Sequence, residues 1–240
     1  MSDSFQPVRK QSLADAVFKQ LRDRILGGSL EAGESLPAER ELAEMLDVNR
    51  GAVREALKRL EQARLISIRH GGGTTVLDYR RTAGTDLLIA LLLDDEGKLN
   101  RKVARSILEM RSALAPSIAY YCALRSPEAG KRLDPIVEEM AANSENLKEL
   151  QLLSLSFWEI LVEGSENIAY ALAFNSLRES YKHFAGLLTM AMAAEFEALE
   201  EYEALRDAVH RSDPDEAARH GNQIVEKGAL SLQTLLDLLP

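Results

Sequence analysis

The chain has 240 residues, of which 46% are hydrophobic, 5% aromatic and 28% charged, and its formal net charge is −9. This length predicts two domains, one small and one larger, and the apolar fraction is ample for buried cores. The longest apolar run, residues 87–93, is too short to cross a membrane, and no signal peptide is visible. The single cysteine, Cys122, excludes a disulfide framework within one chain. We therefore expect a cytoplasmic protein with no membrane partner.

The charge is unevenly distributed along the chain. Residues 1–81 carry 14 Lys+Arg and 12 Asp+Glu, whereas the remainder carries 15 and 26. From Arg50 to His70 there are six basic residues and two acidic ones. Binding to phosphate depends on local positive charge, so the negative net charge does not exclude a nucleic-acid partner.

The first predicted element is a helix that Ser12 can cap and that Gly27 and Gly28 end. The next stretch, PAERELAEMLDVNRGAVREALKRLEQARL from Pro37, reads as two helices joined by a tight turn. Asn49 is a suitable N-cap for the second of these two helices. Apolar residues recur at helical spacing in both, with Leu42, Met45 and Leu46 in the first and Val53, Leu57 and Leu60 in the second.

The second helix of this pair opens with basic residues. Arg50, Arg54 and Lys58 recur every fourth residue and form a stripe on one face. Arginine can bond bidentately to guanine, and the start of the second helix of a helix-turn-helix enters the DNA major groove. An exposed, solvated helix face is the alternative interpretation of such a stripe.

The segment ISIRHGGGTTVLDY follows, in which two β-prone runs flank a glycine cluster. This pattern predicts a hairpin. Three helices and a hairpin make a winged helix-turn-helix, which we expect to be a DNA-binding domain over residues 1–78. Residues 79–84 are expected to form a linker.

Residues 85–240 contain no convincing strand and divide into six or seven helical segments. The predicted fold class is therefore mainly α, with an all-helical bundle as the effector domain. Pro116 falls inside one segment and is expected to kink or divide it. We expect the bundle to bind a ligand and to form a dimer.

The pattern PAERELAEMLDVNRGAVREALKRLEQARLISIRHGGGTTV resembles the winged-helix domain of GntR-family transcription regulators, and the helical remainder resembles their FadR subfamily. The likeness covers nearly the whole chain. Four stretches are similar to the fatty-acid-responsive member of that subfamily, namely RHGGGTTV, TAGTDLLIALL, SILEMRSALAPSIA and FWEILVEGSENIAYALAFNSLRESYKHF.

The resemblance assigns DNA contacts to individual positions. It implies that Arg40, Arg50 and Arg54 read bases and that Asn49 bonds a phosphate. It also implies that His70 and Gly71 form a wing tip in the minor groove. This chain departs from its relative at residues 51–52, where Gly-Ala replaces hydroxyl residues that touch the DNA backbone.

Many members of the subfamily bind a divalent metal through an aspartate and three histidines. Here the corresponding positions are Ser154, Trp158, Tyr202 and, for the last histidine, Ile224. A metal needs several ligands that converge on one point. We therefore expect no metal and no cofactor.

The expected effector site is an apolar pocket with a few polar groups. Its expected contacts are Arg111, Trp158, Asn175, Tyr202 and Asn222, although ordinary core packing is an alternative for each. Arg111 is suited to pair with an acidic ligand. Trp and Tyr at former metal positions favour a long-chain acyl-CoA or another carboxylate, and a small organic acid or sugar acid is the alternative.

The sequence disfavours two other classes of protein. An enzyme is disfavoured because the sequence has no phosphate-binding glycine loop, nucleophile elbow or metal pair. A constitutive architectural DNA-binding protein would not need a helical body of this size. The expectation is a homodimeric repressor of fatty-acid or related metabolism that binds a palindromic double-stranded operator and releases it when the effector binds.

Overall fold

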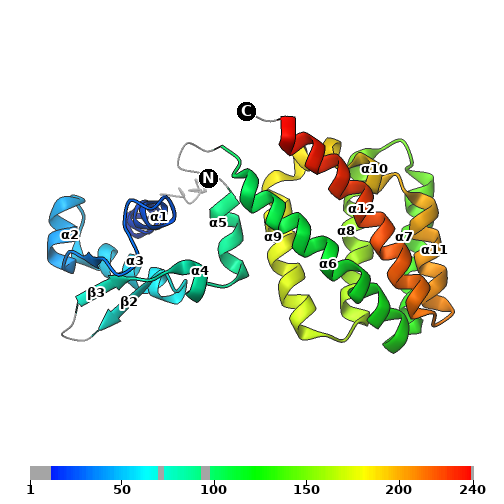
Figure 1. Cartoon of the computed structure of the whole chain (residues 1–240), viewed down its shortest axis with the longest axis horizontal. Coiled ribbons are helices and arrows are strands. Elements are labelled where there is room, and N and C mark those ends of the chain that lie inside the picture. The colour runs from blue at the N-terminus through cyan, green and yellow to red at the C-terminus, as the bar shows by residue number, and fades with distance from the viewer. Residues whose placement is uncertain (1–11, 70–72, 93–97, 239–240) are drawn as a thin grey trace, which may run out of the picture. The chain divides into compact units, whose positions relative to one another are not determined.

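The computed structural model describes residues 12–69, 73–92 and 98–238, leaving aside the side chains of 179–185 and 187. Contacts divide the chain into two compact units, Met1–Leu99 and Asn100–Pro240 (Figure 1).

The first unit opens with three helices and a small antiparallel sheet. The helices are α1 (Leu13–Leu26), α2 (Glu39–Met45) and α3 (Arg50–Gln62). The strands are β1 (Ser35–Leu36), β2 (Ile66–Arg69) and β3 (Gly73–Val76), in the order β1-β3-β2. The predicted hairpin is confirmed as β2 and β3, with Ile66 opposite Val76. Strand β1, in which Ser35 pairs with Thr75, was not predicted.

Capping and apolar spacing explain why these helices form. Ser12 and Asp15 make a capping box at the start of α1. The side-chain oxygen of Asn49 accepts a 2.9 Å hydrogen bond from the backbone N–H of Ala52, which confirms it as the N-cap of α3. The inward face of α3 packs on α1 and the sheet, and it consists of Ala52, Val53, Ala56, Leu57 and Leu60.

The residues after the wing belong to the first unit. They form α4 (Tyr79–Thr82), a short 3-10 helix η1 (Thr85–Leu87) and α5 (Leu88–Leu92). Leu87 is buried in the core of this unit. The hydroxyl of Thr82 donates a 2.8 Å hydrogen bond to the carbonyl of Arg64. The expected linker, 79–84, is thus a helical turn fastened to the winged-helix body, and the boundary between the units follows Leu99.

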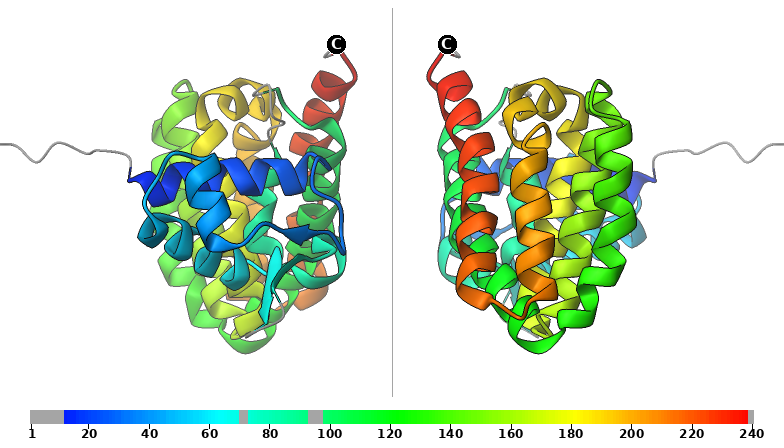
Figure 2. Two further views of the ribbon diagram at one scale, coloured as in Figure 1. Left: turned by 90° about the vertical axis from the view of Figure 1, so that its left-hand side faces the viewer. Right: turned by 90° about the vertical axis from the view of Figure 1, so that its right-hand side faces the viewer.

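The second unit is a helical bundle, as predicted. Figure 2 shows α11 between α12 and α7. Helix α6 runs unbroken through Pro116, so the expected division does not occur. The helical elements are α6 (Arg101–Arg125), η2 (Pro127–Ala129), α7 (Gly130–Ala142), α8 (Leu147–Gly164), α9 (Ile168–Ala191), α10 (Ala193–Phe196), α11 (Leu199–His210) and α12 (Pro214–Leu238).

Helices α6 and α12 pack antiparallel along most of their length. Near one end Arg105 forms an ion pair with Asp237. About four helical turns farther along, a Cβ on Gly221 would lie 3.0 Å from the Cβ of Ala119, so the two backbones approach closely. Cys122 is buried on α6, and burial raises the pKa of its thiol to about 12. None of the described helices is long and apolar enough to span a membrane.

Candidate nucleic-acid interface and effector region

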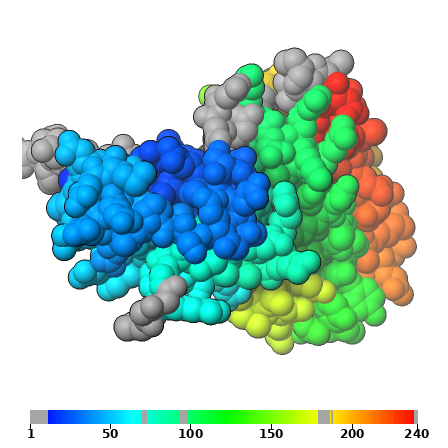
Figure 3. Space-filling model, turned by 60° about the vertical axis from the view of Figure 1, so that its left-hand side comes forward, coloured from blue at the N-terminus to red at the C-terminus, as the bar shows by residue number. Residues whose placement is uncertain are grey.

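The outward face of α3 carries the basic stripe. Arg50, Arg54 and Lys58 are exposed, while the opposite face of the helix is buried in the core. The structure thus confirms that the arginines at the start of this helix are available to a partner. Figure 3 shows the surface of this region, with α2 and α3 in lighter blue.

Arg54 is held by a carboxylate from the neighbouring helix. Its Nη2 and Nε lie 2.9 Å and 3.1 Å from Oε2 of Glu39 on α2. This hydrogen bonding, together with the attraction between the charges, raises the pKa of the guanidinium. Glu39 therefore orients Arg54 across the two helices of the motif.

The other predicted DNA contacts differ in their surroundings. Arg40 lies on α2 with its Nε 3.9 Å from Oε1 of Glu44, and both side chains are well exposed. Asn49 uses its oxygen for the helix cap, so its amide N–H groups are what it can offer to a phosphate. Within the described parts of the chain, Arg50 has no ion-pair partner. His70 and Gly71 lie outside the described residues.

In the second unit, Arg111 of α6 forms an ion pair with Glu195 of α10. The Glu195 side chain is 1% exposed and that of Arg111 is 20% exposed. Burial raises the pKa of the Glu195 carboxyl group, and the charge of Arg111 and its hydrogen bond oppose that rise. Oε2 of Glu195 has no hydrogen-bond partner among the described residues.

Tyr202 and Trp158 are both buried, as expected for residues of the bundle interior. The hydroxyl of Tyr202 on α11 lies 2.8 Å from the hydroxyl of Ser154 on α8. Phe157 packs edge-on against the Tyr202 ring, with 5.0 Å between ring centroids. The Trp158 indole lies beside Gly221 of α12, whose Cβ would be 3.7 Å from it.

These residues do not fit the metal site that the subfamily implies. The aspartate position and one histidine position hold two hydroxyls that bond to each other, and the last position holds the buried, apolar Ile224. Over the described parts of the chain, no three His, Cys, Asp or Glu side chains are grouped to hold an ion. That the protein binds no metal remains a prediction.

The two remaining predicted effector residues differ in their exposure to solvent. Asn222 is half-buried on α12, whereas Asn175 is exposed on α9 and does not join the interior group. Sequence reasoning missed Glu195 and the buried hydrogen bond of 2.6 Å from Thr189 to Gln151. A single acid in the mostly apolar run TMAMAAEF was the available signal for Glu195.

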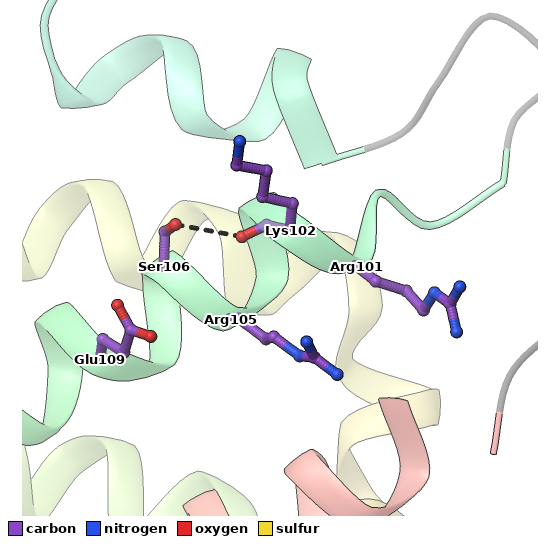
Figure 4. Close-up of a pocket in the computed structure, with 5 residues that line it drawn as sticks. All are labelled: Arg101, Lys102, Arg105, Ser106 and Glu109. Atoms are coloured by element: carbon purple, nitrogen blue, oxygen red, sulfur yellow. Dashed lines mark hydrogen bonds between the residues drawn. The ribbon is translucent and has the colours of Figure 1, made fainter. Parts of the chain in front are cut away.

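A separate hollow of about 580 Å³ lies beside the first turns of α6 (Figure 4). Ser106 in its wall donates a 3.0 Å hydrogen bond to the carbonyl of Lys102. The hollow contains none of the predicted effector residues. Its lining is polar and mostly charged, and consists of Arg101, Lys102, Arg105, Ser106 and Glu109.

Comparison with family models identifies both units. Residues 13–76 match the model described as bacterial regulatory proteins, gntR family, and residues 106–227 match the FCD domain. The first match contains the helix-turn-helix, and the second contains Arg111, Trp158, Glu195 and Tyr202.

Full-length relatives agree with these matches. The transcriptional regulator Mce2R of Mycobacterium tuberculosis is 38% identical over 97% of each chain. A putative L-lactate dehydrogenase operon regulatory protein of Escherichia coli is 30% identical over 88% of this chain and 83% of its own. The fatty acid metabolism regulator protein of Serratia proteamaculans is 26% identical over 72% of this chain and 71% of its own. The chain belongs to the GntR family and is a DNA-binding transcription regulator, not an enzyme, with an FCD effector domain of the FadR subfamily.

Proposed function

We propose that this regulator is a homodimer that binds a palindromic operator and releases it when an acidic effector enters the FCD domain. The effector would have a largely apolar body, as a long-chain acyl-CoA does. Arg40, Arg50 and Arg54 would read bases. Asn49 would contact a phosphate, and the wing tip, His70 and Gly71, would lie in the minor groove. The regulator would act in the cytoplasm, where its operator is accessible.

The observation that carries the effector class is Arg111. Its side chain is four-fifths removed from solvent and already holds one carboxylate, that of Glu195, and a guanidinium fork of this kind matches the carboxylate of an acidic ligand. Trp158 and Tyr202 are buried in the same unit and supply apolar surface. The proposed contacts are therefore Arg111 for the acidic group, Trp158 and Tyr202 for the body, and Asn222 at the edge.

A small organic acid is the second candidate. The L-lactate operon regulator is 30% identical to this chain, compared with 26% for the fatty-acid regulator. The lack of a fitting metal site weighs against this candidate, because a small hydroxy acid has little apolar surface to bind through. The FCD domain speaks against a constitutive architectural role, since it is an effector-binding domain.

Operator binding measured by fluorescence anisotropy tests the proposal. The DNA is the region upstream of the protein's own gene, and the added compounds are palmitoyl-CoA, palmitate, L-lactate and gluconate. Palmitoyl-CoA or palmitate should release the DNA. Release from nearly full occupancy requires a preference of about 5.5 kcal/mol for the DNA-free conformation. Release by lactate or gluconate alone would contradict the acyl assignment.

Variants separate the effector site from the DNA-binding surface. Arg111→Ala should weaken the effector response and leave operator affinity nearly unchanged. The matched control is Arg178→Ala, because Arg178 is also a partly buried arginine of the second unit, 2.7 Å from Oε1 of Glu159. Equal effects of both variants would show that Arg111 has no special role.

The dimer is tested independently by sedimentation equilibrium. A two-fold dimer places two recognition helices on half-sites about one DNA turn apart. A monomer at micromolar concentration, with or without operator, would contradict this part of the proposal.

A further inference from the structure

The ion pair of Arg111 and Glu195 joins three helices of the second unit. Arg111 lies on α6 and Glu195 on the one-turn helix α10, and the carboxylate rests against Gly228 of α12. A Cβ at Gly228 would lie 2.0 Å from Oε2 of Glu195. The missing side chain at Gly228 therefore makes the space that the carboxylate occupies.

Hydrogen bonds within the protein only partly replace the water that the Glu195 carboxylate loses on burial. It is fully buried, yet only one of its oxygens is bonded, and Oε2 has no hydrogen-bond partner among the described residues. A buried ion pair contributes little net stability unless its remaining lone pairs are satisfied. Burial also raises the pKa of Glu195, so the charged form is disfavoured where it lies. Glu195 is thus a weakly held occupant of the space beside Arg111.

We propose that the space beside Arg111 is a carboxylate-binding site and that Glu195 is its built-in occupant, which the carboxylate of an acidic effector displaces. The proposal deepens the proposed function, because it names the group through which that effector is recognised and the residue that competes with it. Helix α10 has only four residues, so moving Glu195 does not require a long helix to shift.

The neighbouring interior indicates what kind of molecule bears the carboxylate. Gly221 and Gly228 lie on one face of α12, two turns and about 10 Å apart along the axis. Gly221 adjoins the Trp158 indole, whose Nε1 has no hydrogen-bond partner among the described residues. A ligand of this length would place its carboxylate at Arg111 and an apolar body, with one hydrogen-bond acceptor, against Trp158.

Chemical rescue in the full-length protein tests the site without knowledge of the natural effector. Glu195→Ala removes the occupant and leaves a buried cation, so its melting temperature should fall below that of the wild type. Acetate or propionate should then fill the site. At ten times its dissociation constant, either acid should raise the melting temperature of the variant by about 3–6 °C above sodium chloride of equal ionic strength.

Three proteins serve as controls. The wild type should show no such rise at these concentrations, since Glu195 already occupies the site. The double variant Arg111→Met/Glu195→Ala should lose the response, because the cation is gone. Glu159→Ala removes the partner of Arg178 at a more exposed ion pair and should respond to acetate no more than to chloride.

Glu195→Gln keeps the size of the side chain and serves if the alanine variant does not fold. It removes the charge that pairs with Arg111, so formate should displace this amide more readily than it displaces the Glu195 carboxylate and should stabilise the variant more than chloride does. If neither variant is stabilised by a carboxylate beyond chloride, or if the double variant responds equally, the inference is overturned. Operator release is measured separately. If a carboxylate stabilises the variant but no acid tested releases the operator, the carboxylate site is supported and the proposed function is contradicted. If an acid releases the operator but no carboxylate stabilises the variant, the proposed function is supported and the carboxylate site is contradicted.

Discussion

The two arginines proposed to contact DNA from the start of α3 differ in how their side chains are held. Glu39 holds Arg54 in one orientation before any DNA is present. Arg50 has no such partner in the described structure, so it must be ordered when it binds. Ordering a long side chain opposes binding, and an arginine that is already positioned loses less freedom. If both arginines contact bases as proposed, Arg54 would be the pre-arranged contact and Arg50 the adaptable one.

Replacing Arg50 by alanine should weaken operator binding by about 1–3 kcal/mol and relax discrimination at one base pair in each half-site. The expected loss is sequence-specific, because a bidentate contact to a base edge is removed. Anisotropy titrations with the operator, with single-base variants of it and with random DNA measure this effect.

Lys58 provides the matched control, since it lies two turns along the same exposed face. A lysine that contacts only phosphate should weaken binding to all sequences alike when it is replaced by alanine. If Arg50→Ala behaves as Lys58→Ala does, Arg50 does not read a base.

The Ser154–Tyr202 hydrogen bond is a stabilising contact within the bundle. Tyr202→Phe removes one partner and leaves the buried Ser154 hydroxyl without this bond, which should cost about 1–3 kcal/mol in the free energy of unfolding. Ser154→Ala/Tyr202→Phe removes both partners and should cost less than the two single changes added together. Urea unfolding of the wild type, the two single variants and the double variant completes this double-mutant cycle. If the changes in the free energy of unfolding were strictly additive, the two hydroxyls would not be coupled.

At the scale of elements, replacing each of two helical glycines by alanine should change the stability of the protein in opposite directions. Gly228→Ala forces a methyl group against the buried Glu195 carboxylate, and we expect a loss of about 1–3 kcal/mol. Gly186→Ala on α9 meets no atom within 4 Å, and alanine should stabilise that helix by about 0.5–1 kcal/mol. Thermal and urea unfolding measure both changes. A neutral Gly228→Ala would mean that Glu195 moves aside without loss.

Elements with long periodic patterns and good caps were predictable from the sequence. Helix α3 begins after Asn49 as expected, because its cap and its apolar spacing are both local signals. Met45 was assigned to the buried face of α2 but is 69% exposed. In a helix of only seven residues, the sequence pattern is too short to determine which face packs against the core. Strand β1 exists through its pairing with β3, about 40 residues away, which no local pattern reveals.

The candidate effector region was predictable only in part. Arg111, Trp158 and Tyr202 were named as effector contacts from the sequence, a role that stays a prediction, and the burial of Trp158 and Tyr202 was anticipated. Glu195 and Gly228 were not, since the role of each depends on the other across two helices. Pro116 was expected to kink or divide α6, and the helix is not divided, because packing against α12 compensates for the one hydrogen bond that proline removes.

At the scale of the whole molecule, charge is unevenly distributed along the chain. The first 81 residues are slightly basic and the remainder is strongly acidic. A locally basic surface binds phosphate, and an acidic body limits association with DNA elsewhere. The division matches the two family models, one for a DNA-binding domain and one for an effector domain.

The stability of the DNA-binding unit should depend on how far its chain extends beyond the wing. A fragment of residues 1–84 would end before Leu87, which is buried in the core of the first unit. Removing a buried leucine forfeits about 1.5–3 kcal/mol, so this fragment should melt at a lower temperature than residues 1–99. Within the longer fragment, Leu87→Ala should reproduce much of the difference, and Asp86→Ala, at an exposed neighbouring position, should not. Circular dichroism melts measure all four proteins. Equal stability of the two fragments would place the functional boundary at 84/85, and a clear deficit in the shorter one would extend the winged-helix domain to include α5.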